Sequence, residues 1–291
     1  MSRSVGFVGL GRMGYHMARH LVEAGFDVTG VDVLPEARAR AAVAGIAVAA
    51  DLSALSSVPV VLSSLPDTPD VCLVYEAPFG LFGVLQRDSL CVDLSTISVA
   101  TSTELAARAS ERGIGFVDAP VSGTAIHAEE GSLAIMIGGT TAAVDRARPF
   151  LEPFSSSIHH IGAAGSGLQM KLITNRLLTT HVVGIAEAIV EMEAAGLEVA
   201  NCLELLRAGA VPRLLDYKAG PMARRDYSPL FTIDLMAKDL GLAEEQRPAG
   251  RLASVAAAVV REAREAGLGA ADLGAVIEVV VRSVSDERRR G

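Results

Sequence analysis

The sequence predicts an α/β protein, with a mostly parallel β-sheet in its first half and only helices in its second half. Three observations support this prediction. Short apolar runs alternate with helical stretches from residue 4 to about residue 160. These runs are almost continuously apolar, which is typical of parallel strands that helices cover on both faces. Beyond residue 167 only the helical period remains.

The predicted strands are short and rich in apolar or β-branched residues: Ser4–Gly9, Asp27–Val33, Val58–Leu65, Leu90–Leu94, Gly115–Asp118 and Leu133–Ile137. The helices predicted between them are Gly14–Ala24, Pro35–Ala44 and Ala100–Arg112. Strands that alternate with helices in this way indicate βαβ units.

A long helix is predicted to follow and to join two domains. From Leu168 to Met192 apolar residues occur nearly all round the helix, which indicates a buried helix. Ser166 is expected to cap its start and Gly196 to take the position after its end. At 1.5 Å per residue, about 30 residues span roughly 45 Å. Further helices are predicted at Cys202–Ala208, Thr232–Glu245, Arg251–Ala266 and Ala270–Val284. We expect the domains to cover residues 1–162 and 163–291.

Composition and charge exclude several classes of protein. The chain is 50% apolar and 21% charged with a net charge of −8, which allows a large core but gives no broad basic surface for nucleic acid. No apolar run approaches the ~20 residues needed to span a bilayer, and we expect no signal peptide before the first strand. Cys72, Cys91 and Cys202 lack metal or redox spacing, as do the histidines, so we expect no metal site and a reducing, cytoplasmic setting.

Lysine is rare in this chain. Only Lys171, Lys218 and Lys238 occur among 26 lysines and arginines. Arginine replaces lysine readily on a solvated surface, but it cannot release a proton near neutral pH. The three lysines are therefore the first candidates for chemistry, against the alternative that they are chance survivors on the surface. Lys218 matches no functional position, and we expect it on the surface.

A glycine-rich segment follows the first predicted strand. Gly9-x-Gly11-x-x-Gly14, with Leu10, Arg12 and Met13 between the glycines, opens the next helix. The first glycine suits a tight turn, the second lets a pyrophosphate approach the backbone, and the third lets helix and strand pack closely. The pyrophosphate would lie over the free amides of the helix N-terminus. This context predicts a Rossmann-type domain that binds a dinucleotide.

Asp32 stands at the end of the second predicted strand, eighteen residues after Gly14. A carboxylate at this place can accept hydrogen bonds from the adenosine ribose and would repel the 2′-phosphate of NADP. We therefore expect NAD rather than NADP, although Arg38 is near enough in sequence to weaken that preference. The alternative for Asp32 is an ordinary turn residue.

The sequence resembles the β-hydroxyacid dehydrogenase family, which groups 3-hydroxyisobutyrate dehydrogenases with tartronate semialdehyde reductases. The resemblance covers nearly the whole chain and rests on four motifs in the family's order: the glycine segment, Asp118-Ala-Pro-Val-Ser-Gly123, Gly165-Ser-Gly-Leu-Gln-Met-Lys171-Leu-Ile-Thr-Asn175, and Lys238-Asp239-Leu240 with Ala243. Two shorter matches are Leu65-Pro66 and Asp93-Leu-Ser-Thr96.

The resemblance implies a role for each motif. Leu65, Pro66 and Thr96 would touch the dinucleotide, with helix capping by the Ser95–Thr101 segment as the alternative for Thr96. Ser122, Gly123 and Thr124 would bind the substrate, with an ordinary turn as the alternative. Many relatives have a second glycine where Thr124 stands, so its side chain would narrow the pocket or add a hydroxyl donor. Lys238 would close over cofactor and substrate, with a solvated lysine as the alternative. The helical domain would pair two copies into a homodimer or a larger assembly.

The residues themselves support a compatible mechanism. Oxidation of an alcohol by hydride transfer needs a group that removes the hydroxyl proton, and the reverse reaction needs the same group as an acid. The resemblance assigns this role to Lys171, and Asn175 follows one turn later on the same helix face. A lysine in water has a pKa near ~10.4, so burial or a neighbouring cation would have to lower it. The alternative is a lysine that reaches the surface.

The sequence thus predicts an NAD-dependent dehydrogenase of a small anionic hydroxy acid or its semialdehyde. An imine reductase shares the architecture, but such proteins usually carry aspartate or tyrosine in place of Lys171 and use NADP. A non-catalytic dinucleotide-binding protein would have an inert residue in place of Lys171. The identity of the hydroxy acid stays open at this stage.

Overall fold

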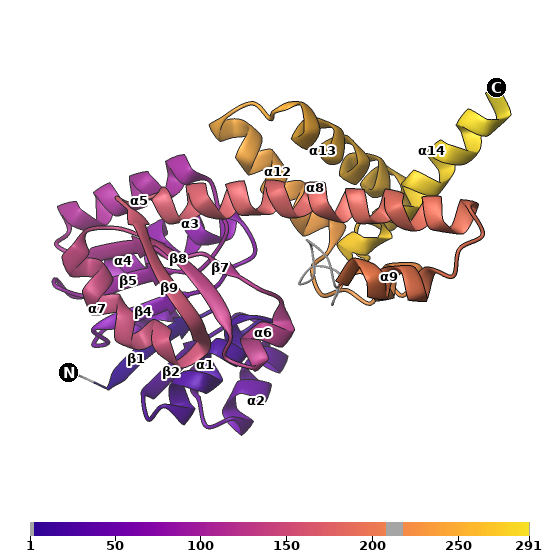
Figure 1. Cartoon of the computed structure of the whole chain (residues 1–291). Coiled ribbons are helices and arrows are strands. Elements are labelled where there is room, and N and C mark those ends of the chain that lie inside the picture. Colours follow the sequence, from indigo (N-terminus) through magenta and orange to yellow (C-terminus); the bar gives the residue numbers. More distant parts are fainter. Residues whose placement is uncertain (1–2, 208–217, 291) are drawn as a thin grey trace. The chain divides into compact units, whose positions relative to one another are not determined.

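The computed structural model describes residues 3–207 and 218–290. They form two compact units, Met1–Lys171 and Leu172–Gly291. Each unit has its own hydrophobic core. The two units share one unbroken helix, α8 (Ser166–Ala194), which is the long helix in Figure 1.

The first unit is built on one mixed sheet. Within the described residues the sheet has nine strands in the order β3-β2-β1-β4-β5-β6-β8-β7, with β9 paired to β8. The strands are β1 (Ser4–Val8), β2 (Asp27–Val31), β3 (Ala47–Ala49), β4 (Val60–Ser63), β5 (Leu90–Asp93), β6 (Gly115–Asp118), β7 (Val121–Ser122), β8 (Leu133–Gly138) and β9 (Ser155–Gly162). The strands from β3 to β6 run parallel, whereas β8 is antiparallel to β6 and β7. The predicted mostly parallel sheet is confirmed.

Helices connect these strands. They are α1 (Gly14–Glu23), α2 (Pro35–Val43), α3 (Thr68–Glu76), α4 (Leu81–Val84), α5 (Val99–Glu111), α6 (Ala125–Glu129) and α7 (Thr141–Leu151), with the short 3₁₀ turns η1 (Leu52–Leu55) and η2 (Glu152–Phe154). All residues of β4 and β5 are buried, because neighbouring elements cover both faces of the central strands. This burial explains why these strands are apolar, and not alternating, up to their last residues, Ser63 and Asp93.

Four helices of the first unit, α3, α4, α6 and α7, were not predicted from the sequence. The two longer ones, α3 and α7, both begin after a side-chain cap, since Asp67 accepts a hydrogen bond from the amide of Asp70 and Thr140 accepts one from the amide of Ala143. The capping residues lie in segments rich in turn-forming residues, which hide the helical period that follows.

The second unit contains helices and turns but no named strand in its described residues. Beyond α8 these elements are α9 (Val199–Arg207), α11 (Gly220–Ala223), α12 (Ile233–Gln246), α13 (Arg251–Ala263), the π-helical turn η4 (Arg264–Leu268), the 3₁₀ turn η5 (Leu273–Val276) and α14 (Ile277–Arg290). The last helix was predicted from Ala270 but begins at Ile277, because the Asp272 side chain accepts the amide of Gly274 and starts a 3₁₀ turn first.

Two expectations about α8 need correction. Ser166 does not cap the helix, because its Oγ has no hydrogen-bond partner among the described residues. The amide of Gly165, just before α8, and the amide of Leu168, in its first turn, bond instead to the distant carboxylate of Asp118. The helix is also not buried all round, since the side chains of Ile173 and Leu177 are 59% and 58% exposed. An apolar second face needs a partner, and the described part of the chain leaves these two side chains uncovered.

Within the described residues, no helix combines the length and the apolar character that crossing a membrane requires.

Candidate active site

The glycine segment forms a tight turn between β1 and α1. Gly9 has a φ of +89°, and a Cβ there would lie 2.3 Å from the carbonyl oxygen of Ser64. A Cβ on Gly14 would lie 1.9 Å from the carbonyl oxygen of Gly9. Both glycines are thus required by the fold itself, the first for its left-handed backbone and the second for close packing of helix on strand.

Gly11 differs from its two neighbours in the segment. A Cβ at Gly11 would meet no described atom within 4 Å, so the packing of the chain does not explain a glycine at this place. The space beside Gly11 adjoins the first turn of α1, where backbone amides point out of the helix. A bare backbone at this place fits the close approach of a pyrophosphate. The segment therefore suits the dinucleotide predicted from the sequence.

The carboxylate of Asp32 follows β2 and reaches the glycine segment. One oxygen accepts a hydrogen bond from the amide of Leu10 at 2.7 Å, and the other accepts one from the amide of Leu34 at 2.8 Å. Each carboxylate oxygen has a second lone pair, so the group can still accept from a ribose hydroxyl. Asp32 therefore fixes the glycine segment in addition to the role predicted from the sequence.

Two arginines of α2 complete this region. Arg40 donates to the carbonyl oxygen of Leu10 at 2.7 Å, and its guanidinium lies 4.5 Å from the centre of the Tyr15 ring. Arg38 donates to the backbone carbonyl of Asp32 at 2.6 Å. The role of Arg40 could not be predicted from the sequence, because an arginine on an exposed helix carries no local signal of such a contact. Arg38 is held beside the residue expected to discriminate against the 2′-phosphate.

A buried network joins the two other loops expected to touch the dinucleotide. Asp93 Oδ1 at the end of β5 accepts from the hydroxyls of Ser63 at 2.8 Å and Ser95 at 2.6 Å. Ser95 Oγ in turn accepts the amide of Leu65 at 2.9 Å. The network therefore holds Leu65-Pro66 against Ser95-Thr96.

Helix capping does not account for Thr96. Ser98 is the residue that caps α5, by accepting a hydrogen bond from the amide of Thr101. Ser98, and not Thr96, is therefore the capping residue of this segment. Thr96 remains a candidate for contact with the dinucleotide.

The candidate cofactor residues lie on one edge of the sheet. The glycine segment, Asp32, Leu65-Pro66 and Ser95-Thr96 follow β1, β2, β4 and β5 respectively, and these four strands are parallel. Their carboxyl ends therefore share an edge, which is where ligands bind in open α/β sheets.

The expected substrate loop leaves the sheet through β7. Ser122 pairs with Ala134 on β8, and Gly123 follows with a φ of +138°. A Cβ on Gly123 would lie 2.9 Å from the Cβ of His127, so this position requires glycine for both its backbone and its packing.

His127 occupies the groups of Thr124 that could otherwise face a ligand. The amide of Thr124 donates to His127 Nδ1 at 3.1 Å, and its hydroxyl lies 3.0 Å from the same nitrogen. This contact places histidine where a capping box has glutamate or glutamine. His127 thus holds both the amide and the side chain of Thr124 at the start of α6. The only sequence signal for this pair is the spacing Thr-x-x-His, which the usual capping-box pattern does not include.

Lys171 and Asn175 lie one turn apart on α8, and both side chains are buried. A lysine that only reached into solvent would not be 7% exposed, so burial disfavours the alternative considered for Lys171. Burial also penalises the charged form of an amine, which is the condition that a lysine base requires.

Asp239 on α12 joins two of the predicted site residues of the second unit. Asn175 Nδ2 donates to Asp239 Oδ2 at 2.6 Å, and Lys238 Nζ lies 3.1 Å from Asp239 Oδ1. The Asp239 side chain is buried. Asp239 stands within the lysine motif, but its role could not be predicted, because its contact with a residue 64 positions earlier is visible only in the fold.

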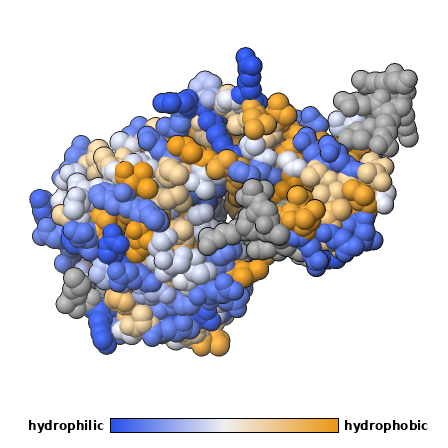
Figure 2. Space-filling view, in the orientation of Figure 1, coloured by the Kyte–Doolittle hydropathy of each residue, from blue (hydrophilic) through white to orange (hydrophobic). Residues whose placement is uncertain are grey.

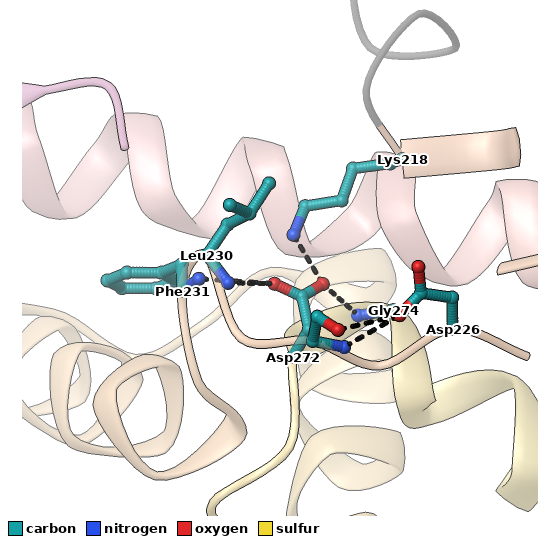
Figure 3. Close-up of polar contacts among 7 residues, drawn as sticks. Lys218, Asp226, Leu230, Phe231, Asp272 and Gly274 are labelled. Atoms are coloured by element: carbon teal, nitrogen blue, oxygen red, sulfur yellow. Dashed lines mark hydrogen bonds and ion pairs between the residues drawn. The ribbon is translucent and has the colours of Figure 1, made fainter. Parts of the chain in front are cut away.

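Lys218 was wrongly expected on the surface. It is 3% exposed, and its Nζ lies 2.6 Å from Asp272 Oδ1 (Figure 3). The second oxygen of Asp272 accepts the amides of Leu230 and Phe231. Burial would raise the pKa of Asp272, but the charge and hydrogen bond of Lys218 and the amides of Gly274 and Phe231 outweigh it and lower that pKa. Through Asp272, Lys218 is connected to the Leu230–Phe231 segment of the second unit. This buried ion pair gives Lys218 a structural role.

Comparisons with known proteins agree with these features. The family model of the NAD-binding domain of 6-phosphogluconate dehydrogenase matches residues 4–162. A second model, described as the NAD-binding of NADP-dependent 3-hydroxyisobutyrate dehydrogenase, matches residues 165–280. Together the two models cover both compact units.

Individual relatives match over most of their length. The chain is 33% identical to 2-(hydroxymethyl)glutarate dehydrogenase of Eubacterium barkeri, with 96% of this chain and 95% of the relative covered. It is 36% identical to NAD-dependent L-serine dehydrogenase of Pseudomonas aeruginosa, with 84% and 85% covered. Among solved structures, Mycobacterium tuberculosis 3-hydroxyisobutyrate dehydrogenase with L-serine gives a TM-score of 0.85 at 34% identity, over 96% of this chain and 99% of that one.

Proposed function

The chain belongs to the β-hydroxyacid dehydrogenase family, and on that premise we propose that it transfers a hydride between NAD and a small hydroxy acid. The observation that carries the proposal is the buried amine of Lys171 on α8, in a chain that has almost no other lysine. The carboxyl edge of the parallel sheet supplies the complementary dinucleotide site.

The cofactor would be held by residues 1–162. Gly9 to Gly14 would take the pyrophosphate, and Asp32 would accept from the adenosine ribose. Leu65, Pro66 and Thr96 would contact the remainder of the dinucleotide from the two loops that the Asp93 network holds together. A bound nicotinamide supplies the hydride acceptor in one direction and the hydride donor in the other.

The substrate would be held by the residues that the sequence predicted for this role. The Ser122 hydroxyl and the Gly123 amide would receive its carboxylate, with Thr124 fixed by His127 at the edge of the loop. Lys171 Nζ would take the hydroxyl proton as the hydride leaves, and would return it in the reverse direction. Asn175 and Lys238, which Asp239 holds in place, would orient the substrate.

The relatives suggest a narrower substrate class. 3-Hydroxyisobutyrate, L-serine and 2-(hydroxymethyl)glutarate, named in the matched proteins, all carry a primary hydroxyl on the carbon next to the one that bears the carboxylate. The carbon that bears the carboxylate also carries the hydroxymethyl group and a third substituent. The three compounds differ only in this third substituent. We propose that this chain also acts on such 3-hydroxy acids, with the substituent as the variable part.

A panel of hydroxy acids tests the proposed function. With NAD present, 3-hydroxyisobutyrate, L-serine and 2-(hydroxymethyl)glutarate are compared with lactate, 4-hydroxybutyrate and the methyl ester of 3-hydroxyisobutyrate, and NADH absorbance is followed. At least one 3-hydroxy acid should be oxidised faster than lactate, a 2-hydroxy acid, and 4-hydroxybutyrate, a 4-hydroxy acid. The ester should react poorly because it lacks the charge that the Ser122 loop would bind. No NADH from any acid, and no NADH consumption with the matching semialdehydes, would reject the proposal.

Substitution of Asp32 tests the cofactor preference. Asp32→Ala removes an ionised acceptor of the ribose, so the KM for NAD is expected to rise by about tenfold or more. NADP should gain relative to NAD, because the repulsion of its 2′-phosphate is lost while Arg38 stays beside the site. The measurement is kcat/KM with both cofactors. Asp27→Ala, at the exposed start of β2, is the control. An unchanged ratio between the cofactors would remove Asp32 from this role.

We also propose a cytoplasmic homodimer. Cys72, Cys91 and Cys202 are all free, as suits a reducing compartment. Ile173 and Leu177 lie one turn apart on α8 and are exposed, and apolar patches interrupt the polar surface of the face that Figure 2 shows. A second copy of the chain would cover such an apolar helix face.

A further inference from the structure

One buried carboxylate connects the strand that leads to the substrate loop with the helix that carries Lys171. Asp118, the last residue of β6, is fully buried. Its Oδ1 accepts the amide of Gly165 at 2.7 Å, and its Oδ2 accepts the amide of Leu168 at 2.9 Å. Amides at the start of a helix have no partner inside the helix, so a carboxylate that accepts two of them fixes where the helix begins.

The surrounding backbone is shaped to this contact. A Cβ on Gly138 of β8 would lie 2.5 Å from Asp118 Oδ1, and a Cβ on Gly167 would lie 2.9 Å from Oδ2. The Gly167 Cβ would also lie 2.3 Å from the carbonyl oxygen of Met136. Glycine is thus required on both sides of the carboxylate, and no side chain or loop intervenes between the sheet and the first turn of α8. The start of the helix therefore has little room to shift.

The contact bears directly on Lys171, which lies three residues after Leu168 on the same helix. An α-helix is rigid over one turn, so fixing the Leu168 amide fixes the direction in which the Lys171 side chain leaves the helix. Asp118 also stands four residues before Ser122, at the start of the expected substrate loop. Asp118 is thus connected to the substrate loop through the backbone and to the helix through hydrogen bonds.

We propose that Asp118 is the positioning residue for Lys171, and that its ionised carboxylate sets the lysine amine in register with the substrate loop. The proposal rests on the proposed function, in which Lys171 moves the hydroxyl proton. Asp118 acts through the helix and not on the substrate, so its effect falls on the rate of the chemical step more than on cofactor binding.

The ionisation of Asp118 falls in an accessible pH range. Burial raises the pKa of its carboxyl to about 6, although the amides of Gly165 and Leu168 favour the charged form. Among the described residues, the charged group that acts on this pKa is Asp93, which pairs with Asp118 in the ladder between β5 and β6 and raises the pKa further. β8 and the first turn of α8 face the carboxylate with glycines and backbone groups. Protonation turns one acceptor oxygen into a donor opposite an N–H group, which weakens the attachment.

Steady-state kinetics of Asp118→Asn in the full chain tests the proposal. The amide keeps the shape of the side chain but can accept only one of the two N–H groups. We expect kcat to fall by about 10²-fold, as for a misplaced catalytic group, with NADH affinity unchanged. The decline of kcat below pH 6 in the unmodified protein should be absent in the variant. Thr140→Ala removes a side-chain helix cap elsewhere in the same unit and should alter neither.

The scarcity of lysine allows a second test that needs no substrate. Protein labelled with ¹³C at the lysine side chains gives three lysine signals, from Lys171, Lys218 and Lys238. The Lys171 signal should move in Asp118→Asn and stay in place in Thr140→Ala, while the Lys218 signal should stay in both. In the unmodified protein the Lys171 signal should follow a titration with a midpoint of about 6. This last measurement remains informative if the variant does not fold.

The outcomes separate this inference from the proposed function. A Lys171 signal that ignores both the Asn substitution and the titration overturns the positioning role, whatever the enzyme oxidises. Normal kcat with a normal pH profile in Asp118→Asn does the same. A responsive Lys171 signal in a chain that oxidises no hydroxy acid supports the attachment and rejects the proposed reaction.

Discussion

Lys171→Ala is expected to lower kcat for the hydroxy acid by about 10²- to 10⁴-fold, the usual contribution of a positioned acid or base. The hydroxyl proton then has no acceptor as the hydride leaves, so the barrier rises while the residues proposed to hold NAD are untouched. Initial rates of NADH formation give kcat, and quenching of NADH fluorescence gives cofactor affinity. Ordinary turnover in this variant would show that Lys171 is not the acid or base.

Three companion measurements sharpen this result. Lys171→Arg should be as inactive as the alanine variant, because a guanidinium does not release its proton near neutral pH. A small primary amine added to Lys171→Ala should restore part of the rate if the missing group is a base. Thr180→Ala is the control on the same helix. Among the described contacts, the Thr180 hydroxyl donates only to the backbone carbonyl of Arg176, so this variant should keep a normal kcat.

Lys218→Met is expected to have the largest effect on stability. The substitution leaves the buried charge of Asp272 without its partner, which typically costs about 3–5 kcal/mol in the free energy of unfolding. Asp272 also accepts the amides of Leu230, Phe231 and Gly274, so it cannot simply leave the core (Figure 3). Urea unfolding of the full chain, followed by circular dichroism, measures the loss.

The pH dependence of that loss follows from the direction of the pKa shift. The folded-state pKa of Asp272 is lowered, so its ionised form adds stability above the unfolded-state value of about 4. That stability disappears as the pH falls through the folded-state pKa. The difference between the wild type and Lys218→Met should therefore be greatest near neutral pH and should narrow in acid.

An exposed ion pair provides the control for Lys218. Arg264 Nε lies 2.9 Å from Asp234 Oδ1, and the two side chains are 62% and 53% exposed. Arg264→Met should change stability by no more than about 1 kcal/mol, because water screens such pairs. An equal loss of unfolding free energy in Lys218→Met and Arg264→Met would mean that the burial of the Lys218 pair adds nothing to stability.

The sequence determined the fold class and much of the candidate cofactor site by itself. The continuous apolar runs and the glycine segment depend on local backbone and burial rules, and β1, β2 and the Gly9 turn follow those rules directly. Lys171 was identified because its motif and the scarcity of lysine are both properties of the chain itself. These features can be predicted without knowing which residues distant in sequence contact each other.

The tertiary structure decided the partners of the buried polar groups. Ser166 stood in the right place to cap α8, yet Asp118, 47 residues before Gly165, accepts the amides instead. Lys218 meets Asp272 across 54 positions, and Asn175 meets Asp239 across 64. A buried charge or amide must find a partner somewhere, but local sequence does not specify which one, because the choice depends on how strands and helices pack.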